Sequence, residues 1–381
     1  MDFTYDDEQQ ALREAVRGLV GKAYSDFESR RQAVKEDPGF DEKLWARLAE
    51  MGILGLPFRE EDGGSGAGPV EVAIVAEEMG RVLAPEPFLT SVVLAGGIVS
   101  AGASPEQRAE ILGALSGGES VLAFAHAEPG TRWVATAEGV TATQDGDAWT
   151  LSGVKEPVPH GARADQLVVS AKLPEGGTGL FLVDPSAAGT ERTGYATHDG
   201  GRAARVAFDG AAGVPLGEAG ADRTPTIAAV LDIARVMACN EAIGAMEVAL
   251  RATTEYLKNR KQFGVPLNTF QALNFRAADM YVSLELAKSL TTWATMVIAG
   301  GQPDEMADAA RRAALGVSRA GRHLGQEAIQ LHGGIGMTAE YSIGSYTSHL
   351  TALDHLLGDG NFHLSTLVAG IGEYDEVDPL D

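Results

Sequence analysis

The spacing of apolar residues changes twice along this chain. The resulting separation of helix-like from strand-like segments constrains the fold more than any other sequence feature. Up to about residue 118, and again after about residue 222, apolar residues recur at the three- and four-residue intervals of helices with one buried face. Between these segments, short runs alternate apolar and polar residues and are separated by Gly and Pro clusters, which is typical of strands. Helices and strands in separate stretches predict an α+β fold.

Two or three domains or layers are expected, because 381 residues exceed the size at which a single core usually stops growing. We predict an N-terminal α-helical domain at 1–118, a middle β-barrel or β-sandwich domain at 119–222, and a C-terminal four-helix bundle at 223–381. The bundle helices are expected at 224–258, 268–299, 303–331 and 345–369.

Local signals support particular elements. Asp6 and Asp7 stand where they can cap the first helix, and Pro69 suits the first turn of a later one. In the middle domain, the Asp145-Gly146 turn between alternating runs predicts a hairpin.

Composition narrows the range of partners. The formal net charge of -23 disfavours binding to nucleic acid or to an anionic membrane surface. Cys239 is the only cysteine, so an intramolecular disulfide and a thiolate zinc cluster are excluded. His332 and His355 lack partners at metal-ligand spacing, so no metal site is expected. The polar start and the absence of an apolar run near roughly 20 residues predict a cytoplasmic protein without a membrane span.

Two segments of the expected bundle suggest a ligand site. In "LKNRKQFGVPLNTFQALNFRAADM" (257–280), three cations, Lys258, Arg260 and Lys261, precede a break and a helix with Asn268 as its expected N-cap. Cations beside a helix N-terminus can bind a pyrophosphate, although they could equally complement the dipole of the preceding helix. In "QEAIQLHGGIGMTAEY" (326–341), glycines let the backbone approach a ligand closely.

Taken together, Arg-x-Gln-Phe-Gly-x-Pro, the following Phe-Gln and the later Gln-x-x-Gly-Gly-x-Gly resemble the acyl-CoA dehydrogenase family over nearly the whole chain. Within it, the chain is most similar to small subunits of two-component enzymes of the pimeloyl-CoA dehydrogenase type. The resemblance implies the same three-domain order, FAD as cofactor, and tetramers with FAD at subunit interfaces. It also implies which residues match those that hold the pyrophosphate and adenosine of a neighbouring subunit's FAD: Arg260, Gln262, Phe263, Gln271, Gln330, Gly333 and Gly334.

A further match concerns the substrate. Asp232 and Arg235 are three residues apart, so they share one helix face and could simply pair with each other. In the family, an Asp and an Arg at this spacing contact CoA, so the resemblance implies that both residues bind acyl-CoA.

The chain departs from the family around the flavin ring. The family motif Thr-Glu-Pro-Gly-x-Gly-Ser reads "AEPGTRW" here, with Ala127 in place of the hydroxyl and Trp133 in place of the serine. The family's Trp-x-Thr is replaced by Pro157 and Pro159, which removes an aromatic ring, a hydroxyl and two backbone N–H donors. We therefore predict an altered pocket for the flavin ring.

The positions at which the family carries its catalytic base are also altered. The family reaction removes a proton α to the thioester while hydride leaves the β-carbon, so a carboxylate must reach the α-carbon. The usual glutamate aligns with Gly358, or with Asp359 if one residue is inserted, and Asp is common in Gly-rich turns for local hydrogen bonding. A second family position for the base reads Ala234.

Glu241 lies seven residues after Ala234, on the same helix face and among apolar residues. Burial without a partner would raise its pKa towards that of a useful base. The alternative is a structural ion pair with an arginine of a neighbouring helix. Glu241 and Asp359 are the candidate catalytic residues.

Three functional hypotheses remain open. In the first, the chain is the small subunit of a heterotetramer that forms an α,β double bond in an acyl-CoA and passes electrons to an electron-transfer flavoprotein. A homologous dehydrogenase subunit would then carry the base. In the second, it is a catalytically silent structural or ligand-sensing subunit. In the third, it is a self-sufficient homotetramer. The acyl group stays open among dicarboxylic, branched and steroid-linked thioesters.

Overall fold

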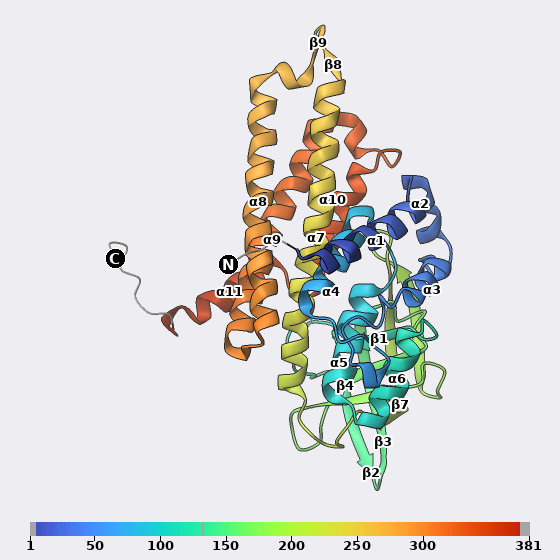
Figure 1. Cartoon of the computed structure of the whole chain (residues 1–381). Coiled ribbons are helices and arrows are strands. Elements are labelled where there is room, and N and C mark those ends of the chain that lie inside the picture. Colours follow the sequence, from blue (N-terminus) through green and yellow to red (C-terminus); the bar gives the residue numbers. More distant parts are fainter. Residues whose placement is uncertain (1–4, 132, 374–381) are drawn as a thin grey trace.

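The N-terminal helices, the β-rich middle and the C-terminal helices pack against one another in the computed structural model, which describes residues 5–131 and 133–373 (Figure 1). The cap predicted for the first helix is confirmed, because an Asp6 carboxylate oxygen accepts the Gln9 N–H at 2.8 Å. Pro69 lies in the first turn of its helix, as predicted. The N-terminal elements are α1 (Asp7–Ala23), α2 (Phe27–Lys35), α3 (Glu42–Glu50), η1 (Glu60–Asp62), α4 (Pro69–Val82), the π-helix η2 (Phe88–Gly96), α5 (Gly97–Gly102) and α6 (Pro105–Ser116).

The middle of the chain forms one seven-stranded sheet, in the order β1-β4-β2-β3-β7-β5 with β6 against β7. Because β4 also pairs with β5, the pairings β4-β2-β3-β7-β5-β4 close into a ring, which is the pattern of a barrel. The predicted hairpin is confirmed, with β2 antiparallel to β3 around Gly146. The strands are β1 (Leu122–Ala125), β2 (Thr141–Asp145), β3 (Ala148–Pro159), β4 (Gln166–Lys172), β5 (Thr178–Val183), β6 (Thr190–Ala196) and β7 (Arg202–Pro215).

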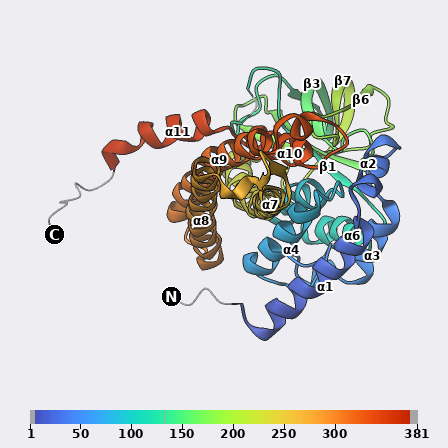
Figure 2. The same cartoon turned by 90° about the horizontal axis from the view of Figure 1, so that it is seen from above.

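Long helices form the C-terminal part, and the final one departs from expectation. The helix predicted at 345–369 is two helices, because Gly358 has a φ of 128° and Asp359 caps a new start. Seen from above, the last helix projects away from the body (Figure 2). The elements are α7 (Thr224–Asn259), β8 (Lys261–Gln262), β9 (Val265–Pro266), η3 (Leu267–Thr269), α8 (Gln271–Gly300), α9 (Pro303–His332), η4 (Gly333–Met337), α10 (Ile343–Leu356), α11 (Gly360–Ala369) and η5 (Ile371–Glu373).

Asn268 is not the N-cap that the sequence suggested. It lies in η3, and α8 starts only at Gln271, without a side-chain cap. The Asn268 carbonyl instead accepts a bond from the Asn274 side chain at 2.8 Å. None of the helices in the described part of the chain is long and apolar enough to cross a membrane.

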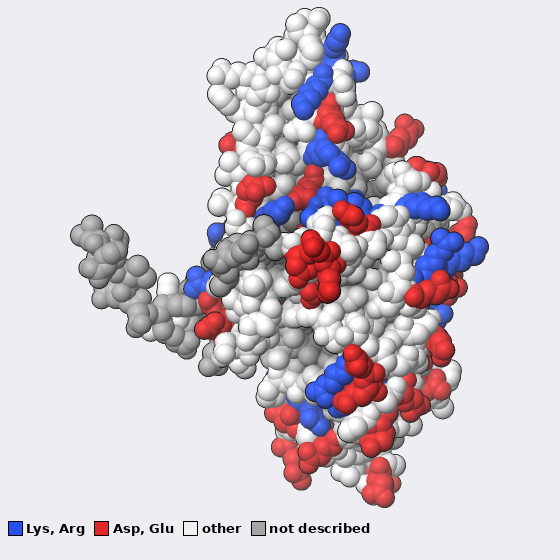
Figure 3. All heavy atoms as spheres, in the orientation of Figure 1, with Lys and Arg blue, Asp and Glu red and all other residues white. Residues whose placement is uncertain are grey.

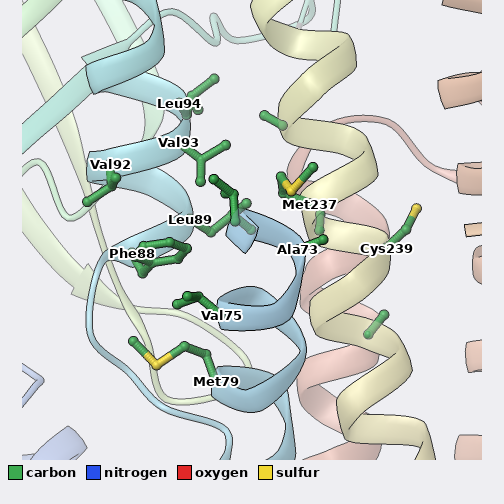
Figure 4. Close-up of a cluster of buried hydrophobic side chains, with 14 of the residues drawn as sticks. Ala73, Val75, Met79, Phe88, Leu89, Val92, Val93, Leu94, Met237 and Cys239 are labelled. Atoms are coloured by element: carbon green, nitrogen blue, oxygen red, sulfur yellow. The ribbon is translucent and has the colours of Figure 1, made fainter. Parts of the chain in front are cut away.

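The closest helix packing in the core is the crossing of α4 and α7. A Cβ added to Gly80 would lie 1.9 Å from the Glu241 carbonyl oxygen, and one added to Gly244 would lie 2.0 Å from the Glu77 carbonyl oxygen. Beside this crossing, apolar side chains from α4, η2 and α7 meet (Figure 4). Cys239 is one of these buried residues.

Replacing Gly244 with alanine is expected to destabilise the protein by about 1–3 kcal/mol or more, because the new methyl group meets backbone that cannot rotate away. The measurement is the free energy of unfolding in urea. Gly18→Ala is the matched control: Gly18 is exposed on α1 with open space around it, so alanine should stabilise that helix by about 0.5–1 kcal/mol. Equal effects of the two substitutions would contradict the close crossing.

Candidate functional site

The end of the bundle that carries the β8–β9 hairpin presents the first predicted ligand segment. Arg260 follows the last residue of α7, and Lys261 and Gln262 pair with β9 across a tight turn. Phe263 has a φ of 53° and is 92% exposed, with its ring 6.2 Å from that of Phe270. Arg260, Gln262 and Gln271 are also exposed, so this segment faces outward. Basic side chains gather near this hairpin, and further down the bundle basic and acidic side chains alternate (Figure 3).

The second predicted segment lies at the same end of the bundle. Gln330, Gly333 and Gly334 are exposed where α9 ends, and a Cβ added to either glycine would meet no atom within 4 Å. Ring stacking of Tyr256 on His332, with centroids 4.5 Å apart, joins the ends of α7 and α9. The structure therefore brings together the two motifs that the sequence places about sixty residues apart.

Asp232 and Arg235 pair with each other, as one of the two sequence interpretations predicted. Arg235 Nη1 donates to Asp232 Oδ1 at 2.6 Å, and both side chains are buried. Burial raises the pKa of Asp232 and lowers the pKa of Arg235. The other donors of Arg235 are used inside the chain as well: Nε bonds the Leu357 carbonyl at 2.8 Å and Nη2 the Trp133 carbonyl at 3.3 Å.

Aromatic side chains fill the space beside Arg235. Trp133 donates from Nε1 to the His355 carbonyl at 3.1 Å, and its ring lies 5.6 Å from that of Phe362. The Arg235 guanidinium lies 5.8 Å from the centre of the Phe362 ring. The two cavities that Arg235 lines are only about 40 Å³ each. Small-molecule pockets usually measure about 300–1,000 Å³, so this region is closed to a ligand of that size.

A buried ion pair connects the two altered flavin motifs. Lys155 is fully buried, and its ammonium group bonds Glu128 Oε1 at 2.6 Å and Ser170 Oγ at 3.0 Å. Burial lowers the pKa of Lys155 to about 8. Burial alone would raise the pKa of Glu128, but Lys155 and backbone N–H donors lower it to about 2. This pair joins the loop that contains Ala127 to the strand that contains Pro157.

Asp359 serves as a helix cap. Its Oδ1 accepts the Phe362 N–H at 2.8 Å and so starts α11. At the alternative position, a Cβ added to Gly358 would lie 2.7 Å from a Phe362 ring carbon and 2.8 Å from His363 Nε2. A side chain at Gly358 would therefore require the loop or these two rings to move.

Glu241 is buried, as predicted, with 8% of its surface exposed. The expected arginine partner is wrong, because Glu241 Oε1 accepts a bond from Nε2 of His349 on α10 at 2.9 Å. Nδ1 of His349 donates to Asp199 Oδ2, also at 2.9 Å. Burial alone would lower the pKa of His349, but the two carboxylates raise it to about 9, so the ring is an imidazolium at neutral pH. No sequence pattern singled out His349 or Asp199.

Comparison with known proteins gives matches over most of the chain. Residues 6–119 match the family model "Acyl-CoA dehydrogenase, N-terminal domain", and residues 224–372 match "Acyl-CoA dehydrogenase, C-terminal domain". The short-chain specific mitochondrial acyl-CoA dehydrogenase of Sus scrofa is 30% identical over 87% of this chain and 82% of that protein.

Solved structures share the fold along nearly their whole length. A variant of the Tcur3481-Tcur3483 steroid ACAD superposes with a TM-score of 0.87 at 33% identity, covering 96% of this chain and 98% of that one. The ChsE4-ChsE5 complex from Mycobacterium tuberculosis gives a TM-score of 0.88 at 27% identity, covering 99% and 100% of the two chains.

The charged His349 predicts a pH dependence of stability. Its pKa is higher in the folded chain (about 9) than in the unfolded chain (about 6.5), so its stabilisation is complete below pH 6.5 and is lost as pH rises through 9. The shift corresponds to roughly 3 kcal/mol. We expect the unfolding free energy of the wild type to fall, relative to that of His349→Gln, between about pH 6 and pH 9.5. Parallel curves for the two proteins would contradict this assignment.

Proposed function

Because this chain belongs to the acyl-CoA dehydrogenase family, whose members use FAD, we propose that it is the small subunit of a two-component acyl-CoA dehydrogenase. In this proposal it contributes the adenosine half of an FAD site to a homologous partner, and the partner supplies the flavin-ring pocket and the catalytic base. Bound FAD would accept the hydride from the β-carbon of the acyl-CoA. The contrast between an open ligand surface at one end of the bundle and a filled one beside Arg235 carries this proposal.

The open end suits the adenosine and pyrophosphate half of FAD. An arginine such as Arg260 offers a planar set of donors that matches phosphate oxygens, and Gln271 and Gln330 add amide donors and acceptors. The exposed Phe263 ring can stack on a planar base, and the unobstructed Gly333 and Gly334 let the backbone approach closely.

The other half of the site does not fit a flavin ring. Ala127 has no hydroxyl, and Pro157 and Pro159 have no backbone N–H to offer. Trp133 and Phe362 occupy the space next to Arg235, whose donors are already bonded inside the chain. The residues that hold FAD in a partner are thus kept, whereas the residues that would hold it in this chain are not.

Exposed apolar surface supports assembly with a partner. On α8, Phe275 and Leu286 are 60% and 63% exposed, and on the projecting C-terminal segment Val368 and Ile371 are 55% and 69% exposed (Figure 2). Exposed apolar side chains that form a contiguous patch, unlike single ones, mark interaction sites. We assign both surfaces to subunit interfaces of a heterotetramer.

The substrate assignment rests on the solved neighbours. One is named a steroid ACAD and another a complex of two different proteins, ChsE4 and ChsE5. Among the open acyl groups we therefore favour a steroid-linked acyl-CoA. Electrons would pass to an electron-transfer flavoprotein, as the family resemblance implies.

Co-expression with a homologous dehydrogenase subunit tests the proposal. We expect flavin absorbance, and its bleaching by acyl-CoA, only in the complex, because Ala127, Pro157 and Pro159 cannot make the contacts that hold the flavin ring in the family. In the complex, Arg260→Gln should weaken FAD binding about tenfold or more, since a charge-assisted hydrogen bond is lost. Arg47→Gln, at an exposed arginine on α3, is the matched control and should leave FAD binding unchanged.

Two other results would favour one of the alternative functions. Stoichiometric flavin and bleaching in the lone chain would favour the self-sufficient homotetramer. A complex that forms without flavin would favour the catalytically silent subunit.

The role of Asp359 can be tested in the same complex. Asparagine caps helices about as well as aspartate but cannot remove a proton, so Asp359→Asn should leave acyl-CoA turnover within about twofold. Asp359→Ala should instead lower the unfolding free energy by about 1 kcal/mol, because the cap is lost. A loss of turnover on the order of a thousandfold in Asp359→Asn would identify Asp359 as the base.

A further inference from the structure

A cavity of about 380 Å³ lies where the N-terminal domain, the β-domain and the bundle meet, and none of the residues of the predicted FAD half-site lines it. Its volume falls within the usual range for small-molecule pockets, about 300–1,000 Å³. We propose that this cavity binds a rigid, neutral, apolar alcohol, whose hydroxyl group bonds to the free oxygen of the Glu241 carboxylate. This inference goes beyond the proposed dehydrogenase function and does not depend on it.

Glu241 provides an unsatisfied acceptor at the wall of the cavity. Its Oε1 is bonded to His349, whereas Oε2 has no hydrogen-bond partner among the residues that the structure describes. The residue is 92% buried and lines the cavity. This oxygen can accept a hydrogen bond from a molecule in the cavity, so a ligand that donates one there is favoured over a ligand that does not.

Arg30 adds a donor at the same polar end. It is 4% exposed, and its Nε and Nη2 donate to the carbonyls of Leu83 at 2.7 Å and Asp199 at 3.1 Å. Its Nη1 has no acceptor in the described part of the chain. A hydroxyl group can donate to Glu241 and accept from Arg30, so it satisfies both groups with one atom.

The charges at this end favour a neutral ligand. The carboxylates of Asp199 and Glu241 both bond the His349 imidazolium, and the Arg30 guanidinium donates to the Asp199 backbone carbonyl. Glu86 and Arg202 line the cavity as well, so an ionic ligand of either sign would meet groups of its own charge. Neither an anionic nor a cationic ligand would be compensated as well as a hydroxyl group.

The opposite wall is apolar, and two rigid proline rings form part of it. It is formed by Leu89 of η2, Leu353 and Leu356 of α10, and by Pro157 and Pro159. The two prolines that replace the expected flavin contacts thus form one side of this chamber. His160 also lies here and bonds Thr90 through Nδ1 at 2.9 Å. A fused-ring molecule loses little conformational freedom in such a site, whereas a flexible chain loses more.

The test compares 2-naphthol with naphthalene in calorimetric titrations of the full-length chain, both alone and in its complex. The two probes share a ring system and differ by one hydroxyl group. We expect 2-naphthol to bind at least about tenfold more tightly, as one charge-assisted hydrogen bond would give. Saturable binding with equal affinities, or no saturable binding of either probe, would overturn the proposal, and this comparison requires no variant.

Variants locate the site. Glu241→Met should bring the affinity for 2-naphthol down to that for naphthalene, because the acceptor is lost. Ala352→Leu narrows the cavity and should weaken both probes, whereas Ala11→Leu, at an exposed position on α1, should weaken neither. Unchanged binding in Ala352→Leu would place the probes elsewhere, and displacement of 2-naphthol by FAD would assign the cavity to flavin instead. Either result would contradict the proposal.

Discussion

The close crossing of α4 and α7 is the constraint on which the other features of the structure depend. Gly80 and Gly244 bring the two backbones into direct contact, with no side chain between them. This contact sets the position of the N-terminal domain against the bundle. It therefore also sets where η2, which follows α4, meets α7 and α10 and contributes its residues to the large cavity.

Buried charges hold the domains in register around this crossing. Lys155 and Glu128 join two segments of the β-domain, and Arg235 joins α7 to the loop before α11 and to Trp133. His349 connects the bundle to Asp199 of the β-domain. Buried pairs of this kind add little net free energy when complete but penalise any arrangement that separates them, so they select one geometry. In this chain, these buried pairs fix the relative positions of the segments that surround the site.

The bundle therefore has two unlike ends. At the hairpin end, polar and aromatic side chains face outward, and the glycines that follow α9 leave their surroundings open. Near Arg235, side chains that could have met a substrate are bonded to one another, and aromatic rings close the remaining space. A chain of this kind can complete a cofactor site on a neighbour without maintaining one of its own, which fits a division of labour between two homologous subunits.

The sequence by itself determined the order of the domains, the first helix with its Asp6 cap, the long helix predicted at 224–258 and the hairpin at Gly146. These features follow from apolar periodicity and turn chemistry, which act between residues a few positions apart. It also identified the two segments for which we propose FAD binding, and it offered the Asp232–Arg235 pair as one of two interpretations. Only the tertiary structure decided that Glu241 bonds His349, 108 residues away, that Asp199 lies on the other side of that ring, and that His160 lines a cavity. Such contacts depend on how whole elements pack, because no local pattern records which side chain another helix or loop will bring alongside.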